Sequence, residues 1–295
     1  LHLRYIAYNQ IENNFNIILD KGNFDKAGTQ ELQDGAKPLL SYFFIGVSLP
    51  SEVFWVNLRP DSEDKMIDPS LENTDMGRIL LEADLQLKKD IAQATSPQGP
   101  AGKEYWDKLY KKIDALFTEK DVTIPTLTRP WIVPDEVVVR EAADSAYIYK
   151  ATLKVMLESD YLKGSEVYDF KDKRLQELND YSTQLLKELV IPQLNKEINS
   201  SQRYAALRQV YYSLILSQWF KARFKGQEGP YAALIDKKDL TGLTSVRPWK
   251  KAVYFQEYQK SFSEKEYNLK ESVNAAYGRT VKSYYSGGVD VGLAL

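Results

Sequence analysis

The chain has 295 residues, of which 43% are hydrophobic and 27% charged, and its formal net charge at pH 7 is -2. This composition is typical of a globular protein, and it excludes a disordered or fibrous chain and a nucleic-acid binder, which needs a concentrated positive face. The absence of cysteine and the single histidine, His2, exclude disulfides, thiolate nucleophiles and multi-histidine metal sites, and a Ser-His-Asp triad would have to use His2.

The sequence predicts no membrane-spanning helix, because no apolar stretch reaches the roughly 18 residues that such a helix needs. The chain starts at Leu1 without a methionine or a signal-peptide pattern. We therefore expect it to be a processed or excised piece of a longer product. We also expect His2 to be a surface residue.

The first part of the chain is predicted to form strands. Residues 3–20 alternate loosely between apolar and polar side chains, which indicates two short strands. Leu39–Leu49 and Glu52–Leu58 are rich in aromatic and β-branched residues. They are predicted to be two further strands, the first fully buried, with Pro50 between them.

An acidic segment, Arg59–Asp75, follows these predicted strands. Six carboxylates lie in it, those of Asp61, Glu63, Asp64, Asp68, Glu72 and Asp75. Such a cluster favours a solvated surface loop. Because calcium prefers hard oxygen ligands gathered in one loop, the alternative is a calcium site made by Asp61, Asp64, Asp68 and Asp75. No other cofactor is indicated.

An amphipathic helix is predicted next, capped by Thr74 or Asp75 and continuing to about Ala92. Apolar side chains recur on its buried face at three- and four-residue steps, and they are Met76, Ile79, Leu80, Ala83, Leu87 and Ile91. Asp84 and Lys88, four residues apart, are expected to pair on the outer face.

Arg78, in the first turn of this helix, is expected to hold the acidic segment through an ion pair with Asp68 or Glu72. The alternative is that it clamps a substrate anion.

A second amphipathic helix is predicted after Thr95–Gly102 and continues to about Phe117. The clearest hairpin in the chain pairs Glu136–Glu141 with Ala146–Leu157. Residues 163–173 are polar, and they are expected to be a linker or mobile loop.

Beyond this linker the pattern is helical. Arg174–Asn199 is predicted to be a helix kinked at Pro192, which removes one backbone hydrogen bond. Arg203–Lys225 is the densest apolar run, and it predicts a central helix around which the rest packs. Ser213 and Ser217 leave a narrow side of that helix where the backbone of a neighbour could approach.

Two shorter helical pieces are expected at Tyr231–Ile235 and Pro248–Phe262, while Tyr267–Leu295 has little helical character. Together the patterns predict an α+β protein. A mixed or antiparallel sheet with packed helices would occupy residues 1–162, and a mainly helical portion residues 174–295. The two portions could also form one continuous domain.

Three tracts occur together in a recognisable order. They are WVNLRP at 55–60 leading into TDMGRILLEAD at 74–84; RPWIVP at 129–134; and LRQVYYSLILSQWFK at 207–221 with YSGG at 285–288. This order resembles that of an uncharacterised family of exported or envelope-associated proteins of environmental bacteria. The resemblance implies an envelope or extracellular setting and one unit of a longer protein. It implies no activity, cofactor or catalytic residue.

Two classes of function remain open. A hydrolase acting on glycans needs only two carboxyl groups beside a cleft, and the acidic segment offers several. The twenty tyrosines and five tryptophans would suit sugar stacking. However, Trp106, Tyr110, Tyr211 and Trp219 fall on apolar periodicities, so burial alone explains them. Phosphate-binding glycine motifs are absent from the sequence, which disfavours a nucleotide enzyme.

The sequence therefore favours a non-catalytic structural, assembly or binding module of the bacterial envelope or exterior. The alternative is a carboxylate-dependent hydrolase acting on glycans. The expected partners are another envelope or extracellular protein, copies of the chain itself, or a glycan.

Overall fold

The computed structural model describes residues 1–22, 28–58, 65–119, 121–123, 130–161, 171–224, 252–256, 268–272, 280–284 and 287–293. The strands are β1 (His2–Asn9), β2 (Asn14–Asp20), β3 (Trp55–Val56), β4 (Asp121–Thr123), β5 (Pro130–Glu141), β6 (Ser145–Leu157), β7 (Asn268–Ser272), β8 (Thr280–Tyr284) and β9 (Gly288–Asp290). The α-helices are α1 (Thr29–Ser48), α2 (Pro69–Glu72), α3 (Asp75–Ala94), α4 (Pro100–Leu116), α5 (Glu158–Tyr161), α6 (Lys173–Leu189), α7 (Ile191–Ser200) and α8 (Ala205–Phe224). Residues 252–256 are also helical.

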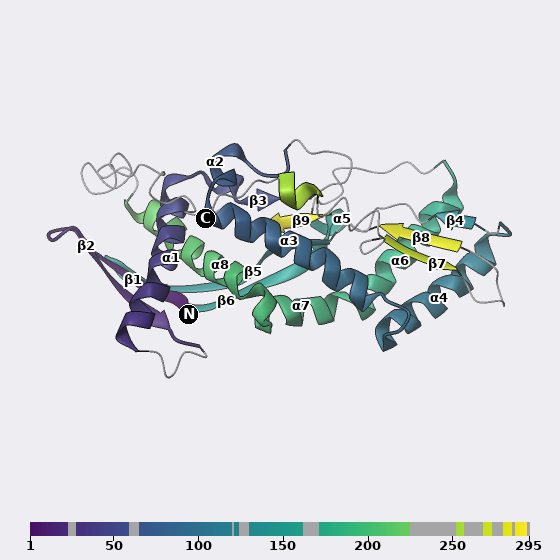
Figure 1. The fold of residues 1–295 in the computed structure, drawn as a ribbon, viewed down its shortest axis with the longest axis horizontal. Coiled ribbons are helices and arrows are strands. Elements are labelled where there is room, and N and C mark those ends of the chain that lie inside the picture. The colour runs from purple at the N-terminus through teal and green to yellow at the C-terminus, as the bar shows by residue number, and fades with distance from the viewer. Residues whose placement is uncertain are drawn as a thin grey trace.

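The fold is α+β, as predicted, with a mixed six-stranded sheet in the order β2-β1-β6-β5-β9-β3. All neighbours in this sheet are antiparallel except β5 and β9, which are parallel. Helix α8 packs on β1 and β6, α7 on β6, and α3 on β3 and β9. Figure 1 shows an elongated molecule with the β1–β2 hairpin at one end and α4 beside the small sheet β4-β8-β7 at the other.

The two short strands predicted in residues 3–20 and the predicted hairpin are confirmed. β1 pairs with β2, and β5 pairs with β6 over longer strands than the alternating pattern indicated. Beyond its short contact with β1, the edge of β6 is capped by amide side chains of α7. Asn199 accepts the N–H of Leu153 at 3.0 Å, and Asn195 accepts the N–H of Val155 at 2.6 Å. These bonds satisfy backbone groups that a neighbouring strand would otherwise pair with.

The predicted central helix is confirmed as α8, which is buried over most of its circumference. Ser213 and Ser217 are fully buried, and Gly46 of α1 approaches Ser217 so closely that a β-carbon on Gly46 would overlap the serine side chain. The small residues thus allow the close helix crossing that the sequence indicated. The helix predicted before α8 is divided at Val190 into α6 and α7, with Pro192 in the first turn of α7.

The prediction of a strand at Leu39–Leu49 is wrong, because all of these residues except the cap residue Leu49 form the second half of helix α1. Its aromatic residues resemble a buried strand, yet the buried positions Leu39, Phe43 and Gly46 recur at helical spacing. The helix starts where the Glu31 carboxylate accepts the N–H of Gly28 at 3.0 Å. The prediction at Glu52–Leu58 was correct only for the two residues of β3.

Helix α3 confirms the predicted amphipathic helix. Thr74 caps it by accepting the N–H of Gly77 at 3.0 Å, and all six predicted apolar positions are buried. Asp84 and Lys88 pair as predicted, but the prediction that they lie on the outer face is wrong. Both are fully buried, because β3 and β9 pack against this side of the helix as well.

Several predictions fall wholly or partly outside the described residues. These are the helical piece at Tyr231–Ile235, most of the linker at 163–173, and most of Pro248–Phe262. In Tyr267–Leu295 the described residues include three strands, β7, β8 and β9. Within the described part of the chain, no helix has the length and apolar character needed to cross a membrane.

Candidate functional site

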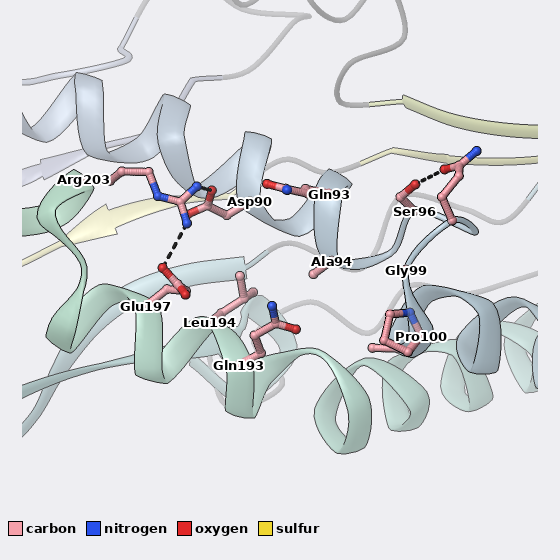
Figure 2. A pocket seen from close by; sticks show the side chains of 12 residues that line it. Asp90, Gln93, Ala94, Ser96, Gly99, Pro100, Gln193, Leu194, Glu197 and Arg203 are labelled. Atoms are coloured by element: carbon pink, nitrogen blue, oxygen red, sulfur yellow. Dashed lines mark hydrogen bonds and ion pairs between the residues drawn. The ribbon is translucent and has the colours of Figure 1, made fainter.

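A pocket of about 520 Å³ lies where the end of α3, the start of α4 and helix α7 meet (Figure 2). The turn that forms it is held by Thr95, whose hydroxyl donates to the carbonyl of Ile91 at 2.7 Å. Gly102 packs against the carbonyl of Ser96, where no larger residue would fit. The lining is mainly polar, and it consists of Asp90, Gln93, Ala94, Ser96, Gln98, Gly99, Pro100, Ala101, Gln193, Leu194, Glu197 and Arg203.

Arg203 bridges the two carboxylates of this pocket, as Figure 2 shows. Its guanidinium lies 2.6 Å from Asp90 Oδ1 and 2.9 Å from Glu197 Oε2. Asp90 is only 5% exposed, and it also accepts hydrogen bonds from Tyr204 at 2.8 Å and from Gln86 at 2.8 Å. Burial, followed by the charge of Asp90, raises the pKa of the Tyr204 hydroxyl, which therefore remains a donor.

This arrangement suits a structural role for Asp90 better than a catalytic one. Glycoside hydrolysis needs one carboxyl group to protonate the leaving oxygen and a second to attack the sugar or activate water. Here Asp90 is engaged by three donors, and the same arginine lies between it and Glu197. The charged side chains in the wall of the pocket, Asp90, Glu197 and Arg203, therefore already pair with one another.

No feature of the sequence singled out this pocket. Arg203 was expected only as the start of the central helix. Its carboxylate partner Asp90 lies more than a hundred positions earlier in the chain. Local periodicity cannot bring together side chains of α3 and of the segment before α8, so only the fold reveals the cluster.

The described part of the structure does not bring the predicted calcium ligands together. Asp61 and Asp64 lie outside them. Asp68 caps α2 by accepting the N–H of Ser70 at 2.8 Å, and Asp75 lies 3.7 Å from Arg78. Over the described ranges, no group of three or more His, Cys, Asp or Glu side chains is placed to hold a metal ion. The calcium site therefore stays a prediction.

Arg78 has ion-pair partners other than the predicted Asp68 or Glu72. It lies 2.7 Å from Glu82 and 3.7 Å from Asp75, both on α3. Arg78 therefore stabilises its own helix through i,i+4 and i,i+3 pairs.

His2 is half-buried, so the prediction of a surface residue is wrong. Its ring centroid lies 5.0 Å from that of Tyr212 on α8. Burial lowers the pKa of His2 to about 4. The imidazole is therefore neutral at pH 7. His2 is half-buried because its strand, β1, packs directly on α8.

The outer side of the sheet carries a row of tyrosine, isoleucine and arginine side chains that crosses four strands. Tyr5 of β1 is opposite both Ile18 of β2 and Tyr147 of β6, and Tyr147 is opposite Arg140 of β5. Ile18 is 54% exposed, Tyr147 40% and Tyr149 58%. The Arg140 guanidinium lies 4.8 Å from the centre of the Tyr149 ring. We call these five residues the tyrosine face.

The tyrosine face differs from the other aromatic residues of the chain. Trp106, Tyr211 and Trp219 are buried, which confirms that apolar packing explains them. Tyr147 and Tyr149 are instead exposed, although the residue between them, Ile148, is fully buried. Strand alternation therefore places these two tyrosines in solvent, where they add nothing to the core.

No protein-family model, no curated protein and no solved structure matches this chain. The resemblance to an envelope-associated family thus stays a prediction.

Proposed function

We propose that this protein is a non-catalytic binding or assembly module that recognises a protein partner through the tyrosine face. One observation carries the proposal: the exposed Ile18, Tyr147 and Tyr149 lie on the sheet side opposite the core. The half-buried Tyr5 and the exposed Arg140 lie in the same row of side chains. Contiguous apolar patches of this kind often mark interaction sites in monomeric proteins.

The chemistry of the tyrosine face suits protein recognition. Tyrosine offers a large, rigid contact surface with few torsions to order, and its hydroxyl can find a polar partner at the rim. Arginine is also enriched in interfaces, and Arg140 is already oriented by its stacking on Tyr149. Because both groups stand on paired strands, little backbone ordering is needed on binding.

We place this activity in the bacterial envelope or outside the cell. The order of sequence tracts supports that location. The expected partner is another envelope or extracellular protein or a second copy of the chain, and a glycan is the alternative ligand.

Site-specific photo-crosslinking tests the proposal. A photoreactive phenylalanine analogue is introduced in place of Tyr149, and in a control protein in place of the exposed Lys103 of α4. We expect a discrete protein adduct from position 149 in cells that express the chain, and none from position 103. Equal adduct patterns at the two positions would contradict the proposal.

The hydrolase alternative can be tested at the pocket that is lined by Asp90 and Glu197. If this pocket hydrolysed glycans, purified protein would release reducing sugar from envelope polysaccharide, and Asp90→Asn would abolish the release. The engagement of both carboxylates by Arg203 favours the binding module.

A further inference from the structure

Strand β9 occupies a slot inside the main sheet, far in sequence from both of its neighbours. Gly288 and Val289 pair with Trp131 and Ile132 of β5. On the other side, Val289 pairs with Val56 of β3. Among the described strands, the two residues of β3 pair only with β9, apart from an isolated bridge between Val56 and Ile67. Without β9, the described sheet would end at two unpaired edges that face each other.

The shape of the slot determines which segment can fill it. Val289 and Val291 are fully buried. A β-carbon on Gly288 would overlap the carbonyl oxygen of Val56, and one on Gly292 would press against the carbonyl oxygen of Ser51. The slot therefore requires glycine at positions 288 and 292 and buries the valines at positions 289 and 291.

Polar groups at both ends of β9 fix its position further. Ahead of the strand, the buried Lys88 ammonium lies 3.5 Å from the carbonyl oxygen of Gly287. At its far end, the Tyr161 hydroxyl donates to the carboxylate of Asp290. The N–H of Val291 then donates to the carbonyl of Phe54 at 3.0 Å. Backbone pairing thus supplies affinity and the side chains supply specificity, as in other strand-addition sites.

We propose that this slot is a strand-acceptor site and that residues 287–293 of one copy fill the slot of a second copy. Every contact described above can form between two copies as it does within one, which is the condition for exchange of an element between protomers. Strand β8 pairs with β4 and ends at Tyr284, so only positions 285 and 286 separate this anchored strand from Gly287. Short hinges of this kind favour exchange of the element that follows them, and mass action makes the exchanged dimer accumulate as concentration rises.

A second copy of the chain is the expected occupant, because it carries the same segment GGVDVGL, residues 287–293. This segment has glycine and valine at the positions where the slot requires them. This inference concerns the β3–β5 slot and not the tyrosine face, so it holds or fails independently of the function proposed above.

Cysteine cross-linking between full chains tests the exchange, since the chain has no cysteine of its own. Trp55 and Asp290 are opposite each other on β3 and β9. One protein carries Trp55→Cys and a second carries Asp290→Cys, and the two are mixed at increasing concentration under mild oxidation. We expect a disulfide-linked dimer that accumulates with concentration. Each protein alone is the control for random collision.

A matched pair of variants controls for pairing that cannot exchange. Val138 and Lys150 are opposite each other on β5 and β6, which a tight hairpin joins. A mixture of Val138→Cys and Lys150→Cys proteins should give no linked dimer. The double variant Trp55→Cys/Asp290→Cys should form an internal disulfide. If it does so while the mixture gives no dimer above the hairpin control, the exchange is refuted.

A second measurement decides the matter if the engineered cysteines fail to oxidise. A fluorescent peptide with the sequence of residues 287–293 is titrated with the wild-type full-length chain, and its anisotropy is recorded. We expect saturable binding that is lost when the peptide carries Gly288→Ala. Absence of binding, or equal binding of both peptides, would overturn the proposal.

Discussion

Replacement of Lys88 by methionine should destabilise the protein by about 3–5 kcal/mol, the usual cost of removing one partner from a buried ion pair. The side chains of Lys88 and Asp84 are 1% and 0% exposed. The Asp84 carboxylate would keep only the N–H of Leu58, at 2.8 Å, as its remaining described partner. The cost is large because a carboxylate that loses its cation has no access to water at this site.

An exposed pair on α4 provides a matched control. Glu104 and Lys108 have the same i,i+4 spacing at 2.7 Å, but their side chains are 51% and 41% exposed. Lys108→Met should therefore leave the stability almost unchanged. Urea unfolding followed by circular dichroism measures both variants. Equal losses of stability for Lys88→Met and Lys108→Met would contradict the stabilising role of the buried pair.

The pH dependence of the Lys88→Met protein offers an internal check. Burial raises the pKa of Asp84 above its ordinary value of 3.8 and lowers that of Lys88, while each charge opposes the shift of the other. Without Lys88, the folded protein holds the Asp84 proton at pH values where the unfolded chain has released it. The stability deficit should therefore shrink as pH falls from about 7 toward about 4. A deficit that stays constant over this range would contradict the assignment.

Three further predictions concern the sheet. Asn199→Ala should lower the free energy of unfolding by about 1–3 kcal/mol in urea titrations, because the N–H of Leu153 loses its acceptor; unchanged stability would show that water replaces the amide. Gly288→Ala should cost about 1–3 kcal/mol in thermal unfolding, since its β-carbon overlaps the carbonyl of Val56; a neutral result would mean that the slot is wider than described. The pKa of His2 is lowered from 6.5 to about 4, so the wild type should lose stability as pH falls through this interval, because the unfolded chain binds the proton first. In His2→Gln this part of the pH dependence of Tm should be absent, and parallel pH profiles for the two proteins would contradict it.

Periodicity predicted the elements that are long and regular. The three- and four-residue spacing of apolar side chains identified α3 and α8, and alternation identified strands β1 and β2 and the β5–β6 hairpin. The same approach failed at Leu39–Leu49, where aromatic and β-branched residues resemble a strand although they lie in α1. Composition alone cannot separate these cases when both structures would be buried.

The features that carry the proposals depend on contacts between distant parts of the chain. The outward direction of Tyr147 and Tyr149 follows from strand alternation, but their exposure depends on which side of the sheet α8 covers. Strand β9 has three residues and begins with glycine, which gives no strand pattern to detect. The bridge from Arg203 to Asp90 likewise joins segments that no local pattern connects.

Sedimentation with isolated bacterial envelope is the decisive test of the proposed binding through the tyrosine face. Purified wild type, the double variant Tyr147→Thr/Tyr149→Thr and the control Ile11→Thr, at a residue that is 97% exposed in the β1–β2 turn, are sedimented with isolated envelope. We expect that wild type and Ile11→Thr bind alike, that the double variant does not bind, and that no sugar is released. Equal binding by all three proteins, or release of sugar by the wild type, would contradict the proposal.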